Sequence, residues 1–203
     1  LLLGPLANAN ARFFHGQLPT WNDFVAHPNY DAFWKRQTIT PYLTDTVSVP
    51  TLNVAGWWDQ EDFYGPVAIY RAMEQHDARR RNFLVVGPWN HGGWARGEGR
   101  LLGGIDFDSA TGQQFRERIQ APFFAYYLKD QGSLVQPEAL LWESGANRWR
   151  AFDQWPPRQA TPRSLYFRSD GRLSFEAPTD SGPAFDHYLS DPAHPVPYRH
   201  RPI

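Results

Sequence analysis

The sequence predicts an α/β unit followed by a β-rich portion. Two apolar runs, 49–56 and 83–86, each close with a Gly and are separated by a helical pattern, which is the order of a strand, a crossover helix and a parallel strand. Beyond Gln131, short apolar runs alternate with Pro and Gly turns, as they do in antiparallel sheets. With 203 residues, the chain is long enough to bury a sizeable core.

Residues 1–45 are expected to form loops and short helices. Tyr30, Phe33 and Trp34 recur at helical spacing, and Pro41 ends the pattern. Aromatic residues at this density more often pack together than bind a ligand. We therefore interpret this segment as structural.

The α/β unit begins with the run 49–56, which is typical of a buried parallel strand. A helix is expected from Gly65 and Pro66, because Pro is well tolerated in the first turn, and Val67 and Tyr70 start its apolar stripe. The second run then returns as a parallel strand. The polar residues that follow the two strands should therefore meet at the carboxyl edge of the sheet, where open α/β sheets hold their sites.

A further helix is expected over 112–129, with a kink at Pro122. The β-rich portion after it resembles the beginning of a sandwich, and residues 196–203 read as an unfinished tail. Its expected strands include 140–142, 149–152, 165–167 and 188–190.

The composition excludes several classes of function. The 20 basic residues nearly balance the 21 acidic ones, for a net charge of −1, which argues against a nucleic-acid or membrane-surface binder. No apolar run approaches the roughly 20 residues of a membrane-spanning helix. The chain has no cysteine, so disulfides, thiolate nucleophiles and Cys-ligated metals are excluded.

Asp59 and His91 each follow a buried strand and lie 32 positions apart. A carboxylate on one ring nitrogen of a histidine fixes its tautomer, so that the other nitrogen can act as a general base. In α/β-hydrolases the chain order is nucleophile, acid and then histidine, and this pair fits the last two places. The alternative is that Asp59 caps the helix near Gly65 and His91 is an ordinary loop histidine.

Glu61 and Asp62 follow Asp59 closely, beside aromatic residues that include Trp58. Carboxylates this close repel one another unless water, a cation or a helix amino end compensates them. They are either solvated acids at a helix start or an anionic subsite for a cationic group such as an ammonium. Adjacent side chains diverge, so not all three acids need point to one place.

The sequence shows no motif for the nucleophilic serine that such a hydrolase needs. None of the nine serines lies in the G-x-S-x-G turn that exposes a nucleophilic serine. Ser144 precedes Gly145, but Glu143 stands before it in the β-rich portion.

No metal or cofactor is expected. The seven histidines form no H-E-x-x-H motif, and the acids at 59–62 lack the spacing of a calcium loop. The Gly-rich stretch 97–104 matches neither a P-loop nor a dinucleotide fingerprint, so it is interpreted as a flexible loop.

Two motifs carry a resemblance to a known family. Residues 56–62 (GWWDQED) and 87–92 (GPWNHG) resemble the acid and histidine motifs of the α-amino acid ester hydrolases. These belong with the cocaine esterases, the glutaryl-7-aminocephalosporanic acid acylase-like proteins and the X-Pro dipeptidyl-peptidases. The second motif is shared widely in that superfamily, whereas the run 59–62 looks like the ester hydrolase branch. Residues 188–197 are similar to the family's carboxyl-terminal β domain, so the resemblance covers most of the chain from about Tyr30.

The resemblance implies three parts. Residues 1–45 would end a helical cap domain, residues 46–132 would form the carboxyl-terminal part of an α/β-hydrolase domain, and residues 133–203 would start an incomplete jelly-roll β-sandwich. The family's serine elbow lies upstream of the acid motif, where this sequence offers no candidate. The chain is therefore expected to be a fragment that is inactive alone.

The resemblance also implies roles for single residues. Asp59 would be the acid and His91 the base of a Ser-Asp-His triad, while Glu61 and Asp62, beside Trp58, would bind the substrate's α-ammonium group. The implied partner is an α-amino acid ester or a β-lactam, without a cofactor. A homo-oligomeric and periplasmic or secreted protein is implied as well.

Two other functions stay open at this stage. The first is a general esterase, an acylase or an X-Pro dipeptidyl-peptidase-like hydrolase that needs no α-amino group. The second is a noncatalytic module that binds a cationic ligand in the acidic, aromatic pocket.

Overall fold

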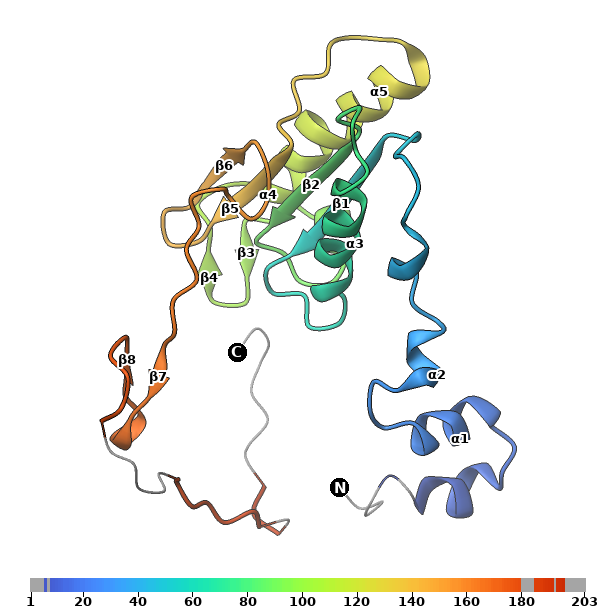
Figure 1. Ribbon diagram of the computed structural model, residues 1–203, viewed down its shortest axis with the longest axis vertical. Helices are drawn as coiled ribbons and strands as arrows, with labels where there is room; N and C mark the ends of the chain where they lie inside the picture. The colour runs from blue at the N-terminus through green and yellow to red at the C-terminus, as the bar shows by residue number, and fades with distance from the viewer. Residues whose placement is uncertain (1–5, 7, 180–184, 192, 196–203) are drawn as a thin grey trace.

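The computed structural model describes residues 6, 8–179, 185–191 and 193–195. Its centre is a four-stranded sheet of order β1-β2-β5-β6 (Figure 1). The first two strands, β1 (Thr51–Gly56) and β2 (Asn82–Gly87), are parallel. This confirms the predicted strand, helix and parallel strand, in which α3 (Tyr64–Glu74) is the crossover helix.

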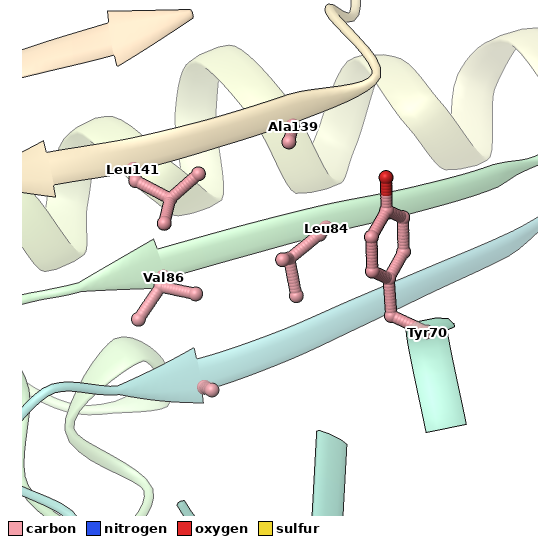
Figure 2. Packing of buried hydrophobic residues seen from close by; sticks show 6 residues of the cluster. Tyr70, Leu84, Val86, Ala139 and Leu141 are labelled. Atoms are coloured by element: carbon pink, nitrogen blue, oxygen red, sulfur yellow. The ribbon is translucent and has the colours of Figure 1, made fainter. Parts of the chain in front are cut away.

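Both faces of the sheet are covered. On the α3 face, Figure 2 shows Tyr70 among side chains of β2 and β5, in a cluster of Ala55, Tyr70, Leu84, Val86, Ala139 and Leu141. Val85 points the other way and packs against helical residues Phe115 and Ile119. Since side chains alternate along a strand, two covered faces explain why the strand sequences are continuously apolar.

The second face is covered by one helical stretch with an irregular middle. It runs through α4 (Thr111–Phe115), the π-helical turn η4 (Arg116–Gln120) and α5 (Ala121–Lys129). Pro122 in the first turn of α5 has no backbone N–H, so the regular helical hydrogen bonds are interrupted there. The predicted helix is therefore confirmed with an irregular turn just before Pro122, while the kink at Pro122 stays a prediction.

The strands after the helix correct the predicted boundary at residue 133. β5 (Ala139–Glu143) pairs with β2 in parallel, and β6 (Arg148–Phe152) pairs with β5 antiparallel. Residues 139–152 thus belong to the α/β sheet and not to a separate sandwich. Short apolar runs joined by a tight turn suit the edge of a mixed sheet as well as a sandwich, so the pattern alone could not assign the partner strand.

Little regular structure follows β6 among the described residues. Two short strands, β7 (Tyr166–Phe167) and β8 (Leu173–Ser174), form a separate antiparallel pair, with the turn η5 (Ser169–Gly171) between them. The strand predicted at 188–190 is not formed, and Tyr188 and Leu189 are exposed. The predicted tail 196–203 lies outside the described residues.

The described residues up to 45 form short helices joined by loops, as predicted. They form η1 (Asn10–Phe14), α1 (Pro19–Ala26), α2 (Ala32–Lys35) and η2 (Thr40–Tyr42). Their aromatic residues pack on one another; Phe33, for example, stacks on His27 at 4.5 Å and meets Trp34 edge-on. In the described part of the chain, no helix is long and apolar enough to cross a membrane.

A pair of carboxyl groups lies at the amino edge of the sheet, opposite the strand ends discussed below. Glu138, just before β5, lies close to Glu74 of α3 and accepts a hydrogen bond from the Tyr70 hydroxyl at 3.2 Å. Asn82 donates its amide to Glu74 at 3.0 Å. Burial, the Glu74 contact and the charge of Asp77 together raise the pKa of Glu138 to about 7. Glu138 therefore holds a proton in the folded protein below about pH 7.

This pair predicts a stability that falls as the pH rises. The folded pKa of Glu138, about 7, lies above its ordinary value of 4.5, so the folded state binds the proton more tightly. Its stabilisation is complete below about pH 4.5 and is lost as the pH rises through 7. Glu138→Gln keeps a hydrogen-bond donor toward Glu74 but has no proton to lose. As the pH rises from 5 to 8, the free energy of unfolding of the variant should therefore increase by about 1 kcal/mol relative to that of the wild type. Urea unfolding at these two pH values measures the difference, and parallel pH profiles of wild type and variant would contradict the raised pKa of Glu138.

Candidate active site

The pairing of β1 with β2 brings two loops together at the carboxyl edge of the sheet. The register ends at Gly56 opposite Gly87. The pairing continues into the loops, because Trp57 donates its backbone N–H to Gly87 at 2.9 Å and Trp58 donates to the carbonyl of Trp89 at 3.0 Å. The two loops therefore start side by side, as the sequence predicts.

Both strand ends are glycine because Trp89 leaves no room for a side chain. A Cβ atom at Gly56 would lie 2.2 Å from the Trp89 carbonyl oxygen, and one at Gly87 would lie 2.4 Å from the Trp89 ring. Trp89 is buried, and its ring packs on Phe115 at 5.3 Å. The glycines thus allow the close approach that sets the geometry of the two loops.

Asp59 and His91 meet between these loops. Asp59 Oδ2 lies 3.2 Å from His91 Nδ1, while Asp59 Oδ1 accepts the backbone N–H groups of Glu61 at 2.9 Å and Asp62 at 3.0 Å. The Asp59 side chain is 2% exposed, whereas that of His91 is 48% exposed. A buried carboxylate thus lies behind a solvent-accessible imidazole, whose Nε2 remains available for a reacting group.

The surroundings keep Asp59 ionised. Burial by itself raises the pKa of Asp59, but the N–H groups of Asp62 and Glu61 and the His91 imidazole outweigh it, so that the pKa lies below its usual value. Asp59 does not cap the following helix, because α3 begins at Tyr64 without a side-chain cap. Its two N–H contacts instead fix the turn that holds the carboxylate toward His91.

The other predicted site residues lie around this pair. Asp62 is 65% exposed, and its Oδ2 lies 3.5 Å from the same Nδ1 atom of His91. Glu61 is exposed. Trp58 is half-buried and packs on Phe107, with the ring centroids 5.5 Å apart.

Ligand atoms of Asp59, Asp62 and His91 all lie within 4.8 Å of one another. A metal ion could use this spacing as well. The expectation of a metal-free site remains a prediction.

A cavity of about 580 Å³ opens beside His91, and its far wall was not predicted as part of a site. The wall is the segment 96–102, which the sequence suggested to be a flexible loop. It runs from the turn η3 (Gly93–Ala95) into a hairpin of β3 (Leu101–Leu102) and β4 (Ile105–Asp106). The structure corrects the earlier interpretation, because this segment is held by specific contacts.

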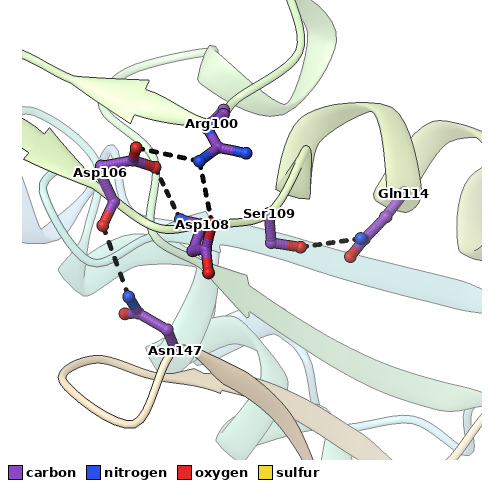
Figure 3. A network of polar contacts seen from close by, with 6 residues as sticks. All are labelled: Arg100, Asp106, Asp108, Ser109, Gln114 and Asn147. Atoms are coloured by element: carbon purple, nitrogen blue, oxygen red, sulfur yellow. Dashed lines mark hydrogen bonds and ion pairs between the residues drawn. The ribbon is translucent and has the colours of Figure 1, made fainter.

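Figure 3 shows the contacts that hold the hairpin. Arg100 pairs with Asp106 at 3.1 Å and with Asp108 at 2.9 Å, and Asp106 accepts the backbone N–H of Asp108 at 2.7 Å. Gln114 of α4 donates to the Ser109 hydroxyl at 2.8 Å. The alternation of Arg and Asp around the Gly pair was the sequence signal that could have indicated this ordered hairpin.

No serine completes the site within the described residues. Among them, the hydrogen bond of the His91 ring runs to Asp59, and no serine hydroxyl is hydrogen-bonded to the imidazole. Ser144 lies exposed in the turn between β5 and β6.

Comparisons with known proteins agree with this arrangement. Residues 6–93, which include both loops, match the X-Pro dipeptidyl-peptidase (S15) family. A predicted serine esterase of Mycobacterium bovis is 35% identical over 143 residues, or 68% of this chain and 20% of that protein. The chain is thus similar in sequence to serine hydrolases, and its first half matches the S15 family in part. The cocaine esterase of a Rhodococcus species is 27% identical over 196 residues, or 90% of this chain and 32% of that enzyme.

Two solved structures are similar to this chain in fold as well as in sequence. An aminopeptidase from a marine sediment archaeon of the Thaumarchaeota is 42% identical, with a TM-score of 0.82 over 97% of this chain and 32% of that one. An α-amino acid ester hydrolase is 36% identical, with a TM-score of 0.87 over 100% of this chain and 34% of that one. These similarities support the predicted superfamily and the α/β-hydrolase type of fold. The chain spans about a fifth to a third of the length of these relatives.

Proposed function

We propose that this chain supplies the acid and the base of a Ser-Asp-His triad in a serine hydrolase. The observation that carries the proposal is the contact between His91 Nδ1 and the buried Asp59 carboxylate, 3.2 Å apart at the carboxyl edge of the sheet. The nucleophilic serine would come from polypeptide outside these 203 residues. Two triad members without the third give almost no turnover, because the triad acts as a unit.

In this mechanism the Asp59 carboxylate accepts a hydrogen bond from His91 Nδ1–H, so that the proton stays on Nδ1 and Nε2 holds a lone pair. Nε2 takes the proton of the serine hydroxyl as its oxygen bonds to the acyl carbon. Asp59 then stabilises the imidazolium, which returns the proton to the departing alcohol or amine. Water repeats the cycle on the acyl-serine and releases the acid, while an amine in place of water gives acyl transfer.

We further propose that the substrate carries an α-ammonium group, as in an α-amino acid ester or a β-lactam amide. Glu61 and Asp62 are exposed carboxylates next to the pair, and Asp62 comes within 3.5 Å of His91. A cationic substrate group would relieve their mutual repulsion. The half-buried ring of Trp58 would form an apolar wall beside them. The two solved relatives, an α-amino acid ester hydrolase and an aminopeptidase, are named for substrates with an amino group.

The cocaine esterase relative favours a second candidate, a general esterase without an amino requirement. Both candidates use Asp59 and His91 in the same way. They differ only in the role of the two exposed acids.

The domain assignments belong to the same proposal. The helices of 8–42 would be the end of a cap, the sheet through Phe152 would belong to the hydrolase domain, and a jelly roll would begin after it. The complete polypeptide would be a homo-oligomer.

One experiment tests both the hydrolase and its amino preference. The polypeptide that carries this chain together with its serine is assayed with phenylglycine methyl ester and with methyl phenylacetate, which lacks the amino group. Replacing Glu61 and Asp62 with Gln and Asn should lower kcat/KM for the amino ester about 10- to 30-fold, because each lost contact between exposed charges contributes up to about 1 kcal/mol. Methyl phenylacetate should be affected less than threefold.

The outcomes separate the candidates. Equal losses on both esters would favour the general esterase. A wild type that hydrolyses neither ester nor any related amide would contradict the hydrolase itself.

A further inference from the structure

Thr111, the first residue of α4, carries a fully buried hydroxyl with two partners. Its Oγ1 accepts the indole N–H of Trp89 at 3.0 Å and donates to the carbonyl oxygen of Gly99 at 2.6 Å. The side chain has no solvent exposure. A hydroxyl has one proton to donate and can accept at the same time, so this arrangement uses it fully.

Trp89 connects this hydroxyl to both loops of the site. Its carbonyl oxygen accepts the N–H of Trp58, the residue before Asp59, and its own position in the chain is two residues before His91. Its ring fills the space that a side chain at Gly87 would need. A shift of Trp89 would therefore move Asp59 and His91 relative to one another.

The start of α4 also holds the cavity wall. Backbone N–H groups of Gly112 and Gln113 donate to the carbonyl oxygen of Glu98 at 2.9 and 3.1 Å. Arg116 donates to the carbonyl oxygens of Trp94 at 2.9 Å and Gly97 at 2.7 Å. The wall segment that faces His91 is thus fixed by the helix that begins at Thr111.

We propose that Thr111 is a positioning residue for the Asp59–His91 pair. By holding Trp89 and Gly99 with one hydroxyl, it fixes the spacing of the pair and the position of the cavity wall beside it. The residue acts through Trp89 and touches no reacting group. Its effect on turnover rests on the proposed hydrolase function, whereas its effect on the geometry of the pair does not.

The test uses Thr111→Val, which keeps the shape and removes both hydrogen bonds, and Thr111→Ser, which restores the hydroxyl. The control is Tyr70→Phe, which removes a hydroxyl hydrogen bond at the opposite edge of the sheet. All are made in the polypeptide that carries the serine. Turnover of phenylglycine methyl ester, Tm and the low-field proton NMR signal of His91 Nδ1–H are measured.

Thr111→Val should lower kcat about 10²-fold with little change in KM, as expected for a misplacement of about 1 Å, and should shift the His91 signal. Thr111→Ser should restore both. Tyr70→Phe should lower Tm without affecting kcat or the His91 signal. If Thr111→Val does not fold, Trp89→Phe removes the same indole donor and should shift the signal in the same direction.

The proposal is overturned if Thr111→Val, or Trp89→Phe in its place, lowers Tm as Tyr70→Phe does but leaves kcat and the His91 signal at their wild-type values. Should the wild type show no hydrolysis, the proposed function fails. The NMR signal still decides whether Thr111 positions His91.

Discussion

Asp59→Asn is expected to lower kcat about 10⁴-fold while leaving the fold intact, the magnitude known for the same change in other Ser-His-Asp enzymes. The reason lies in the two N–H groups of Glu61 and Asp62, which both donate to Asp59 Oδ1. An asparagine would keep its carbonyl oxygen on these donors and turn its NH₂ group toward His91 Nδ1. The imidazole would then have to carry its proton on Nε2, which could no longer accept one from the serine.

The measurement is steady-state hydrolysis of phenylglycine methyl ester, with circular dichroism and Tm to verify the fold. His91→Ala should be as damaging, since it removes the base itself. Asp62→Asn is the matched comparison, because Asp62 lies 3.5 Å from the same nitrogen but is exposed and accepts neither N–H. It should keep kcat for methyl phenylacetate near that of the wild type. Turnover of Asp59→Asn within tenfold of the wild type would contradict a triad acid at this position.

The same preparation separates a triad from a metal site. The ligand atoms of Asp59, Asp62 and His91 are close enough to hold an ion. Turnover that survives prolonged incubation with a chelator agrees with the triad, because none of its steps needs a metal. Loss on chelation and recovery with a divalent cation would assign these side chains to a metal instead.

The position of the site could be predicted from the sequence because it depends on strand ends. Two apolar runs closed by Gly predicted parallel strands, and parallel strands bring their following residues to one edge. Asp59 and His91 could therefore be paired without knowing any side-chain contact. The order of the two residues, with the acid 32 positions before the histidine, indicated the acid and base of a hydrolase triad.

What could not be predicted depends on partners distant in the sequence. The short apolar run at 139–143 suits a sandwich strand as well, and only its pairing with β2 assigns it to the α/β sheet. The Gly-rich segment before the hairpin resembles a mobile loop until Thr111 and Arg116 contact its carbonyl groups. A lone threonine at a helix start carries no pattern, so its two buried hydrogen bonds are visible only in the structure.

Gly56→Ala should be the most disruptive small substitution at the site. Its Cβ would lie 2.2 Å from the Trp89 carbonyl oxygen and 2.8 Å from the carbonyl carbon. Both are backbone atoms, so no rotamer change can relieve the overlap, and the two strand ends must separate. We expect a loss of about 2–3 kcal/mol in the free energy of unfolding, as for other overpacked interiors. The hydrogen bond from Trp58 to Trp89, which aligns the two loops, would lengthen with it.

Gly65→Ala is the matched control, because nothing lies within 4 Å of its Cβ position and it sits in α3. Alanine favours a helix over glycine by up to about 1 kcal/mol, so this variant should be as stable as the wild type or more stable. Urea unfolding of both variants measures the difference. Gly56→Ala should in addition lower kcat, since the same separation moves Asp59 from His91. If the two variants were equally stable, the ends of β1 and β2 could separate without cost. The close contact of Gly56 with Trp89 would then not be needed to hold Asp59 and His91 together.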